Sequence, residues 1–125
     1  MAWTYDNKTG ILNHNNIFVY KDVYGYAGTG DGRNNPTFQC TKDLGPIPSG
    51  KYRIGKLRHG GKLGPLVLNL NPIGHNACGR TLFRIHGNND ADDASTGCII
   101  LPKSVRKRIG KSKDKILHVL GPIWF

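Results

Sequence analysis

The chain has 125 residues, with 18 Lys and Arg against 8 acids, all of them Asp, and a formal net charge of +10. That length fits one domain with an ordinary core, and we expect a single domain over 1–125. No apolar run is long enough to cross a bilayer, and no basic region followed by an apolar stretch opens the chain. We therefore expect no membrane span, and a protein made in the cytoplasm without a signal peptide.

The composition favours short strands joined by tight turns. Gly (17) and Pro (7) are frequent, aromatic residues are spread along the chain, and Glu is absent. Short apolar runs between Gly and Pro turns predict strands, in chain order at 17–20, 23–27, 52–54, 66–70, 81–86, 98–101 and 116–120. About seven to nine strands with one short helix predict a mainly β domain, either a sandwich or a barrel-like sheet.

Basic residues concentrate near the C-terminus. The last 25 residues hold seven Lys and Arg against one Asp. Pro102, followed by Val105 and Ile109 four residues apart and then a glycine, predicts a short helix over 101–110 with a basic outer face. Such a face is either a solvated surface or a contact to a polyanion. Because no nucleic-acid-binding motif accompanies the charge, we do not expect nucleic acid as the partner.

Three patterns resemble binding motifs but lack an essential part. Segment 45–51 has the GxxxxGK letters of a phosphate-binding loop, but Tyr52 replaces the hydroxyl residue that holds magnesium. The run 88–93 resembles a calcium loop without its closing acid. Four side chains have zinc-ligand chemistry without paired spacing, namely His75, Cys78, His86 and Cys98. We expect no metal and no other cofactor.

The three cysteines are too few for a disulfide scaffold, and their odd number leaves at least one free thiol. A bond between Cys40 and Cys78 in an oxidising compartment is one alternative. The sequence leaves it open, because it does not give the Cα separation that a disulfide requires.

The segment from His86 to Cys98 is the most informative. An apolar run delivers His86 beside Gly87, a polar loop follows, and a turn of small residues presents Cys98 at the start of a second apolar run. The loop is long enough to fold back and bring both side chains to adjacent strand ends. A cysteine nucleophile needs a neighbouring histidine to take its proton, and an oxyanion needs backbone N–H groups such as those of Gly97 and Cys98. The arrangement favours acyl transfer over a structural cysteine and a core histidine.

These residues carry a family resemblance. Ile85-His86-Gly87, followed by Ser95-Thr96-Gly97-Cys98-Ile99, resembles the signature of the L,D-transpeptidase (YkuD-like) family. Four further stretches are similar to a bacterial subfamily that includes the type VI secretion L,D-transpeptidase and L,D-carboxypeptidase effectors, namely 3–5, 25–36, 45–55 and 79–83.

The resemblance implies a YkuD-like fold and a role for each matched residue. Cys98 would be the nucleophile and His86 the general base, with the carbonyl of Gly87 orienting the imidazole. The turn beside the nucleophile would be formed by Ser95, Thr96 and Gly97.

The resemblance also implies an antibacterial toxin acting in the periplasm of a target bacterium. Such effectors remove the terminal D-alanine of a tetrapeptide stem of peptidoglycan or exchange it for another D-amino acid. The implied partners are the peptide stems, a component of the secretion apparatus and a cognate immunity protein. Delivery by that apparatus fits the expected lack of a signal peptide.

The chain departs from the family pattern where substrate binding is concerned. Many L,D-transpeptidases place an arginine two residues after the cysteine, where this chain has Ile100, and Asn88 stands where an acid is common. A cation for the substrate carboxylate is therefore expected elsewhere. The three candidates are Arg80, Arg84 and Arg33. Asp92 or Asp93 would either bind ammonium groups of the stem or lie in a solvated loop.

Two other classes of protein remain open. A papain-like or NlpC-like cysteine peptidase places its cysteine before its histidine and at the start of a helix, so the element that follows Cys98 separates it from an L,D-transpeptidase. A non-enzymatic basic domain would have an unreactive Cys98 and would bind polyanions with a steep dependence on salt.

Overall fold

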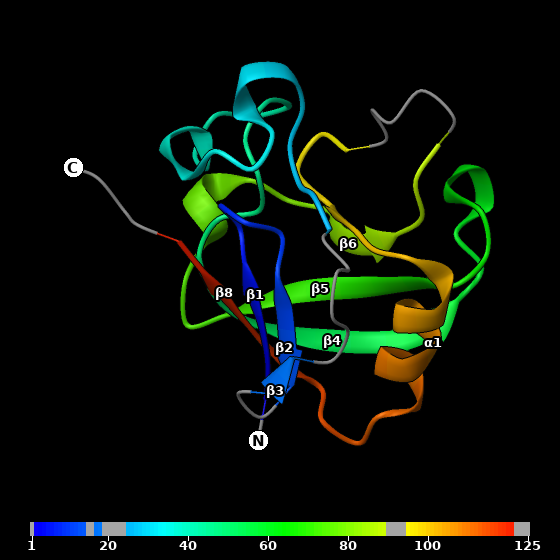
Figure 1. The fold of residues 1–125 in the computed structure, drawn as a ribbon. Coiled ribbons are helices and arrows are strands. Elements are labelled where there is room, and N and C mark those ends of the chain that lie inside the picture. The colour runs from blue at the N-terminus through cyan, green and yellow to red at the C-terminus, as the bar shows by residue number, and fades with distance from the viewer. Residues whose placement is uncertain (1, 15–16, 19–24, 90–94, 122–125) are drawn as a thin grey trace.

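The computed structural model describes residues 2–14, 17–18, 25–89 and 95–121, which form one curled, mixed sheet with a short helix beside it (Figure 1). The strands are β1 (Trp3–Asp6), β2 (Leu12–His14), β3 (Ile17–Phe18), β4 (Gly50–Arg58), β5 (Val67–Ile73), β6 (Phe83–His86), β7 (Ile99–Ile100) and β8 (Ile116–Leu120). The helix is α1 (Lys103–Lys111), and four 3-10 turns lie at Gly30–Gly32, Pro36–Phe38, Gly61–Leu63 and Ala77–Gly79.

The sheet order is β3-β2-β1-β8-β4-β5-β6-β7. Neighbouring strands are antiparallel except at two places, where β1 runs parallel to β8 and β7 runs parallel to β6. The β4–β5 register shifts between Ile54 and Leu57, and such a bulge bends a sheet and increases its twist. The predicted mainly β fold with one short helix is confirmed, in the form of a single curled sheet.

The core draws side chains from most strands and from the helix. Its largest fully buried members include Trp3, Tyr5, Ile47, Tyr52, Leu68, Ile85, Ile99, Leu101, Ile109 and Leu117. Burying an aliphatic or aromatic side chain of this size stabilises the fold by about 1.5–3 kcal/mol. Helix α1 packs against β4 and β5 (Figure 1), so the helix closes one side of this core.

Most predicted strands are present, with changes at their ends. The prediction at 116–120 matches β8, whereas β1 and β2 were not predicted at all. Part of the predicted strand at 23–27 lies outside the described residues, and Tyr26 forms only an isolated bridge to Ile100. Likewise β3 covers the first two residues of the prediction at 17–20, and the rest lies outside the described residues.

The strand predicted at 66–70 extends further than expected. β5 continues to Ile73, and Pro72 lies inside it opposite Tyr52. Strand β6 pairs with β5 only from Leu68 to Leu70, so one side of β5 is open at Pro72. A residue without a backbone N–H is tolerated at such an edge.

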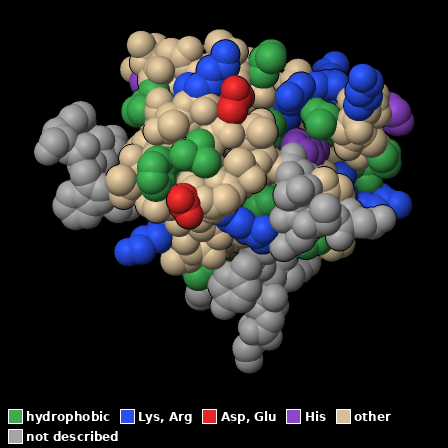
Figure 2. All heavy atoms as spheres, turned by 90° about the horizontal axis from the view of Figure 1, so that it is seen from above, with side chains coloured by type: hydrophobic (Ala, Val, Ile, Leu, Met, Phe, Trp, Pro, Cys, Tyr) green, Lys and Arg blue, Asp and Glu red, His purple; other side chains and the backbone are tan. Residues whose placement is uncertain are grey.

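Helix α1 confirms the predicted helix and corrects its outer face. Val105 and Ile109 are buried, as their spacing predicts. Arg106, counted there among the outward basic residues, is only 8% exposed. Lys and Arg side chains lie at several separate places on the face shown in Figure 2, so the positive charge is not confined to the helix. Among the residues described, no helix is long and apolar enough to cross a membrane.

Candidate functional site

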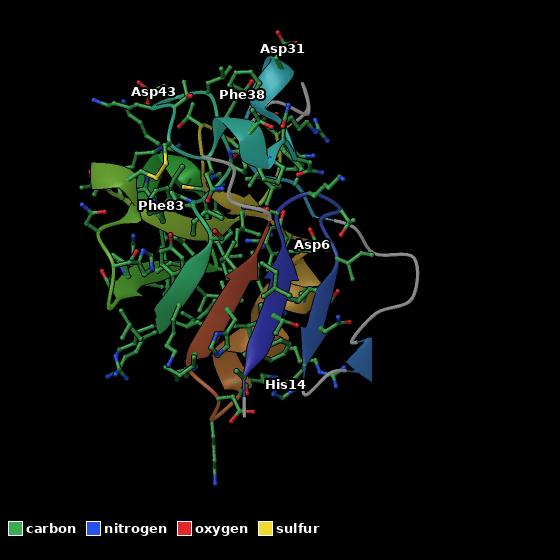
Figure 3. All side chains as sticks on the ribbon, turned by 90° about the vertical axis from the view of Figure 1, so that its left-hand side faces the viewer. Asp6, His14, Asp31, Phe38, Asp43 and Phe83 are labelled. Carbon is green, nitrogen blue, oxygen red and sulfur yellow. A yellow bond between two sulfur atoms is a disulfide. The ribbon has the colours of Figure 1, made fainter. Side chains whose placement is uncertain are left out.

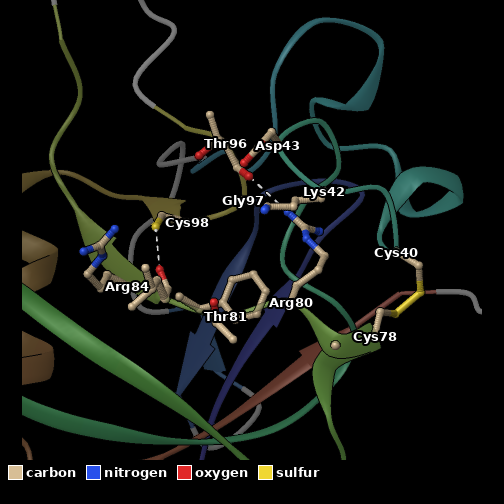
Figure 4. Close-up of a pocket in the computed structure, with 13 residues that line it drawn as sticks. Cys40, Lys42, Asp43, Cys78, Arg80, Thr81, Arg84, Thr96, Gly97 and Cys98 are labelled. Atoms are coloured by element: carbon tan, nitrogen blue, oxygen red, sulfur yellow. Dashed lines mark hydrogen bonds between the residues drawn. A yellow bond between two sulfur atoms is a disulfide. The ribbon is translucent and has the colours of Figure 1, made fainter.

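A cavity of about 440 Å³ opens beside Cys98 (Figure 4). Three segments line it: part of 40–43, the run 78–84, and the turn 96–98. Two of its lining residues, Asp43 and Phe83, lie in the upper left of Figure 3, and His14 lies at the opposite, lower end of the molecule. The thiol of Cys98 and several cationic side chains therefore share one concave surface.

Cys98 is the residue immediately before β7. It is the free cysteine of the chain and is 7% exposed. Its Sγ donates to the carbonyl oxygen of Leu82 at 3.6 Å. Leu82 itself is 74% exposed and has a left-handed backbone, with φ of 64°. The thiol thus points across the cavity toward a strained residue that also lines the cavity wall.

His86, at the end of β6, lies on the same face of the sheet as Cys98. In the parallel β6–β7 pair, Ile85 is opposite Ile99, and both side chains are fully buried in the core. Side chains alternate along a strand, so Arg84 and His86 share the other face. Continuing this register by one residue toward the N-terminus places Cys98 beside Arg84. Both residues line the same cavity. The structure therefore places His86 at the end of β6 and Cys98 just before β7, two positions apart in this register.

The imidazole of His86 is set up to accept a proton. Its Nδ1 lies 2.9 Å from the carbonyl oxygen of Gly87, and because a carbonyl only accepts, Nδ1 must carry the hydrogen. The lone pair is then on Nε2. Burial lowers the pKa of His86, the Gly87 carbonyl opposes this, and the charges of Arg84 and Arg106 lower it further. The ring is therefore neutral at neutral pH.

The two side chains are close in register but are not hydrogen-bonded to each other. The Cys98 thiol is bonded to Leu82, and His86 does not line the cavity. Contacts between catalytic groups are often long in the absence of substrate.

Arg106 supports the histidine half of the site and was missed by the sequence argument. Its guanidinium donates to the carbonyl oxygens of Leu101, Pro65 and Leu66 at 3.0 Å each. It also packs against Gly87, where an added Cβ would lie 2.8 Å from Nη2 of Arg106. A buried arginine thus lies directly against the residue whose carbonyl orients His86. Because Arg106 lies within a run of basic residues, the sequence does not distinguish it from its exposed neighbours.

Ser95 and Gly97 shape the turn that carries the nucleophile. The buried Ser95 hydroxyl donates to the Cys98 carbonyl at 2.6 Å and accepts from the N–H groups of Gly97 at 3.1 Å and Gly28 at 2.9 Å. The Gly97 N–H, expected as an oxyanion donor, is therefore engaged by Ser95. The Cys98 N–H is the donor next to the thiol that these turn bonds do not use.

Arg80, expected as a substrate cation, is instead a clamp. Its Nη1 donates to the carbonyls of Gln39 at 2.7 Å and Pro46 at 2.8 Å, and its Nη2 to those of Gly45 at 3.1 Å and Thr96 at 3.0 Å. Burial lowers its pKa, and nearby groups including Cys98 oppose that shift. Thr96 contributes its carbonyl to this clamp. The fork fixes the turn before Cys98 to the wall of the cavity.

A disulfide closes the same wall. Cys40 and Cys78 are bonded, with their Cα atoms 5.2 Å apart. The sequence left this pairing open, and it removes Cys78 from the set of zinc-like ligands. Among the described residues, no three His, Cys, Asp or Glu side chains are grouped as a metal site.

The other two candidate arginines lie in different places. Arg33 stacks 3.7 Å from the ring centroid of Tyr26 and lines a second cavity, which it shares with Asn88. Arg84 lines the cavity of Cys98, and its Nε is buried without a hydrogen-bond partner. Asp92 and Asp93 lie outside the described residues.

The element after Cys98 is strand β7 rather than a helix, unlike the arrangement in papain-like enzymes. A family model for the Tlde1 domain matches residues 21–118, well over half of the chain and including both His86 and Cys98. The chain belongs to the Tlde1 domain family. Tlde1 domains are type VI secretion effector toxins that act as enzymes and are delivered into a target cell. No curated protein matches the chain closely enough to count as a relative.

Proposed function

We propose that this Tlde1 domain is an antibacterial cysteine acyltransferase that acts on tetrapeptide stems of peptidoglycan. It removes the terminal D-alanine (L,D-carboxypeptidase) or exchanges it for another D-amino acid (L,D-transpeptidase). The observation that carries the proposal is the free thiol of Cys98 in a cavity, on the same sheet face as a neutral His86 with Nδ1 held by Gly87.

The reaction follows from these groups. Nε2 of His86 takes the thiol proton, and the thiolate of Cys98 attacks the carbonyl carbon of the L,D bond. The Cys98 N–H faces the developing oxyanion. The C–N bond then breaks, and His86 gives its proton to the leaving D-alanine amine. Water or the amine of a second D-amino acid attacks the thioester, and the thiol is regenerated.

The proposed setting follows from the family. A secreted effector toxin with this chemistry would act in the periplasm of the target bacterium, where the stems lie. Loss of donor stems weakens cross-linking of the wall. The producing cell would need a cognate immunity protein, and delivery would need a component of the secretion apparatus.

The test is mass spectrometry of purified tetrapeptide muropeptides incubated with the wild type or Cys98→Ala, with and without D-methionine. We expect loss of D-alanine, or its replacement by D-methionine, with the wild type alone. The control is an unchanged unfolding transition for Cys98→Ala. Normal turnover by that variant would end the proposal. Unchanged muropeptides with both proteins, together with salt-sensitive binding to polyanions, would favour a non-enzymatic domain.

A further inference from the structure

Three arginines near the site differ in their hydrogen-bond partners. Both terminal nitrogens of Arg80 donate to main-chain carbonyls, and three carbonyls take donors from Arg106. Arg84 has a buried Nε without any partner. A buried donor without an acceptor is costly, so the guanidinium of Arg84 has hydrogen-bonding capacity that its contacts within the protein do not use. The anion that best fits a guanidinium is a planar carboxylate or a phosphate.

The position of Arg84 selects one group of the substrate. By register, Arg84 lies beside Cys98 on the neighbouring strand, and adjacent strands are about 4.8 Å apart. The carbonyl carbon under attack must lie close to the thiol. The next carbonyl carbon along a peptide is one residue further, at most about 3.6 Å. Arg84 lines the same cavity as the thiol, so its cation is available to the residue beyond the bond that breaks.

We propose that Arg84 binds the terminal carboxylate of the leaving D-residue. The enzyme then acts at the free end of a stem, and a residue without a free carboxylate is a poor leaving residue. This inference rests on the proposed function, and it names the side chain that selects the substrate. The other charged side chains that line the cavity are Lys42, Asp43 and Arg80. Of these, Lys42 is the alternative cation, and it lies on an exposed loop.

Substrate binding at Arg84 would also act on the base. The charge of Arg84 lowers the pKa of His86, in addition to the effects of burial and of Arg106. A bound carboxylate cancels that charge, so the pKa of His86 rises once the substrate is in place. A histidine that holds its proton more readily is better able to protonate the leaving amine. The same residue would therefore recognise the substrate and adjust the acid–base group.

The experiment compares two tetrapeptide muropeptides, one ending in D-alanine and one in its carboxamide. We expect the wild type to prefer the acid in kcat/KM by about ten- to a hundredfold, as expected for a charged hydrogen bond. Arg84→Gln should lose this preference, so that its kcat/KM values for the acid and the amide are similar. Lys42→Gln, the matched control in the same cavity, should keep the preference. Equal discrimination by Arg84→Gln and the wild type would overturn the proposal, as would loss of discrimination in Lys42→Gln alone.

Two further measurements separate substrate recognition from a structural role. The acid limb of kcat/KM for the amide should move to higher pH in Arg84→Gln, because a lowering charge has been removed from His86. Binding of both peptides to Cys98→Ala, measured by calorimetry, should show the same acid preference, and Arg84→Gln should abolish it there. If the wild type turns over neither peptide, the proposed function fails. The binding comparison then still decides the role of Arg84, and equal binding of acid and amide would overturn it.

Discussion

The two halves of the site are held in different ways. The nucleophile half is made of loops: the turn before Cys98 is tied to segment 39–46 by the Arg80 fork, and a disulfide closes the same wall. The base half is built on regular structure, since His86 ends a paired strand and Arg106 projects from α1. Each half uses a guanidinium that binds backbone carbonyls, half-buried in Arg80 and buried in Arg106. Only the half without regular structure has a covalent link as well.

Each half supplies one reacting side chain, and removing either one should have the largest effect on activity. Cys98→Ala and His86→Ala should each lower kcat by about a thousandfold or more, because nucleophile and base act as a unit. The double variant should be no worse than the more damaging single one. Muropeptide turnover measures all three proteins. Additive losses in the double variant would contradict the coupling.

Replacing Arg80 and Arg106 tests whether the two arginines that bind backbone carbonyls stabilise the protein to the same extent. Arg80→Met and Arg106→Met each leave several carbonyl groups without donors, and each should lower the free energy of unfolding by about 2–4 kcal/mol. Arg80→Lys and Arg106→Lys should not restore the lost stability, because lysine lacks the planar guanidinium that donates to several carbonyls at once. Urea unfolding measures the loss, with exposed Arg53→Met as the control. Wild-type stability in either variant would contradict a supporting role.

Reduction of the disulfide should affect the nucleophile half more than the base half. Cys40 and Cys78 are 38 positions apart, and opening a loop of that size should cost about 3–4 kcal/mol. Cys98 should then react faster with iodoacetamide, while the environment of His86, followed by NMR, changes little. A Cys40→Ser/Cys78→Ser protein is the control, since dithiothreitol should not alter it. An unchanged alkylation rate after reduction would show that the disulfide does not hold the nucleophile half in place.

Two glycines allow a sharper comparison. Gly97 has φ of 144°, and a Cβ there would lie 2.5 Å from Nη2 of Arg80, so Gly97→Ala meets both strain and a clash. Gly87 lies outside the left-handed region, and the atoms nearest its Cβ would belong to the side chain of Arg106, the closest at 2.8 Å. We expect Gly97→Ala to lose about 1–3 kcal/mol of stability, and Gly87→Ala less. Thermal unfolding ranks them, and the reverse order would contradict this account of the two clamps.

The smallest expected effect is on the pH dependence of stability. The pKa of His86 lies below its usual value of 6.5 in the folded state, chiefly because the ring is buried. The unfolded chain therefore binds more protons in the window just below pH 6.5, and the free energy of unfolding should decrease as the pH falls through it. His86→Asn should show a shallower decrease. Identical pH profiles for the two proteins would contradict the assigned shift.

The sequence predicted those features that depend on neighbouring residues. The limits of β8, the buried pair Val105 and Ile109, and the placement of His86 at the end of β6 and of Cys98 just before β7 all follow from local spacing. Strand β1 was missed because it inserts beside β8, a pairing between the two ends of the chain that no local window contains.

The supporting groups could not be predicted for the same physical reason. Arg80 bonds the carbonyl of Gln39, and Arg106 that of Pro65, each 41 positions away. Backbone carbonyls exist at every residue, so the sequence does not mark which ones a guanidinium will bind. A basic side chain looks the same in a sequence whether it is solvated, clamped like Arg80 or waiting for a substrate as proposed for Arg84.

The central claim is that Cys98 forms a covalent acyl intermediate. The most direct measurement is intact-protein mass spectrometry after rapid acid quenching of the enzyme with a tetrapeptide muropeptide. We predict an added mass equal to the acyl stem without D-alanine, located by peptide mapping at Cys98 and absent from Cys98→Ala. Turnover of the stem with no adduct, or an adduct on another residue, would contradict the account.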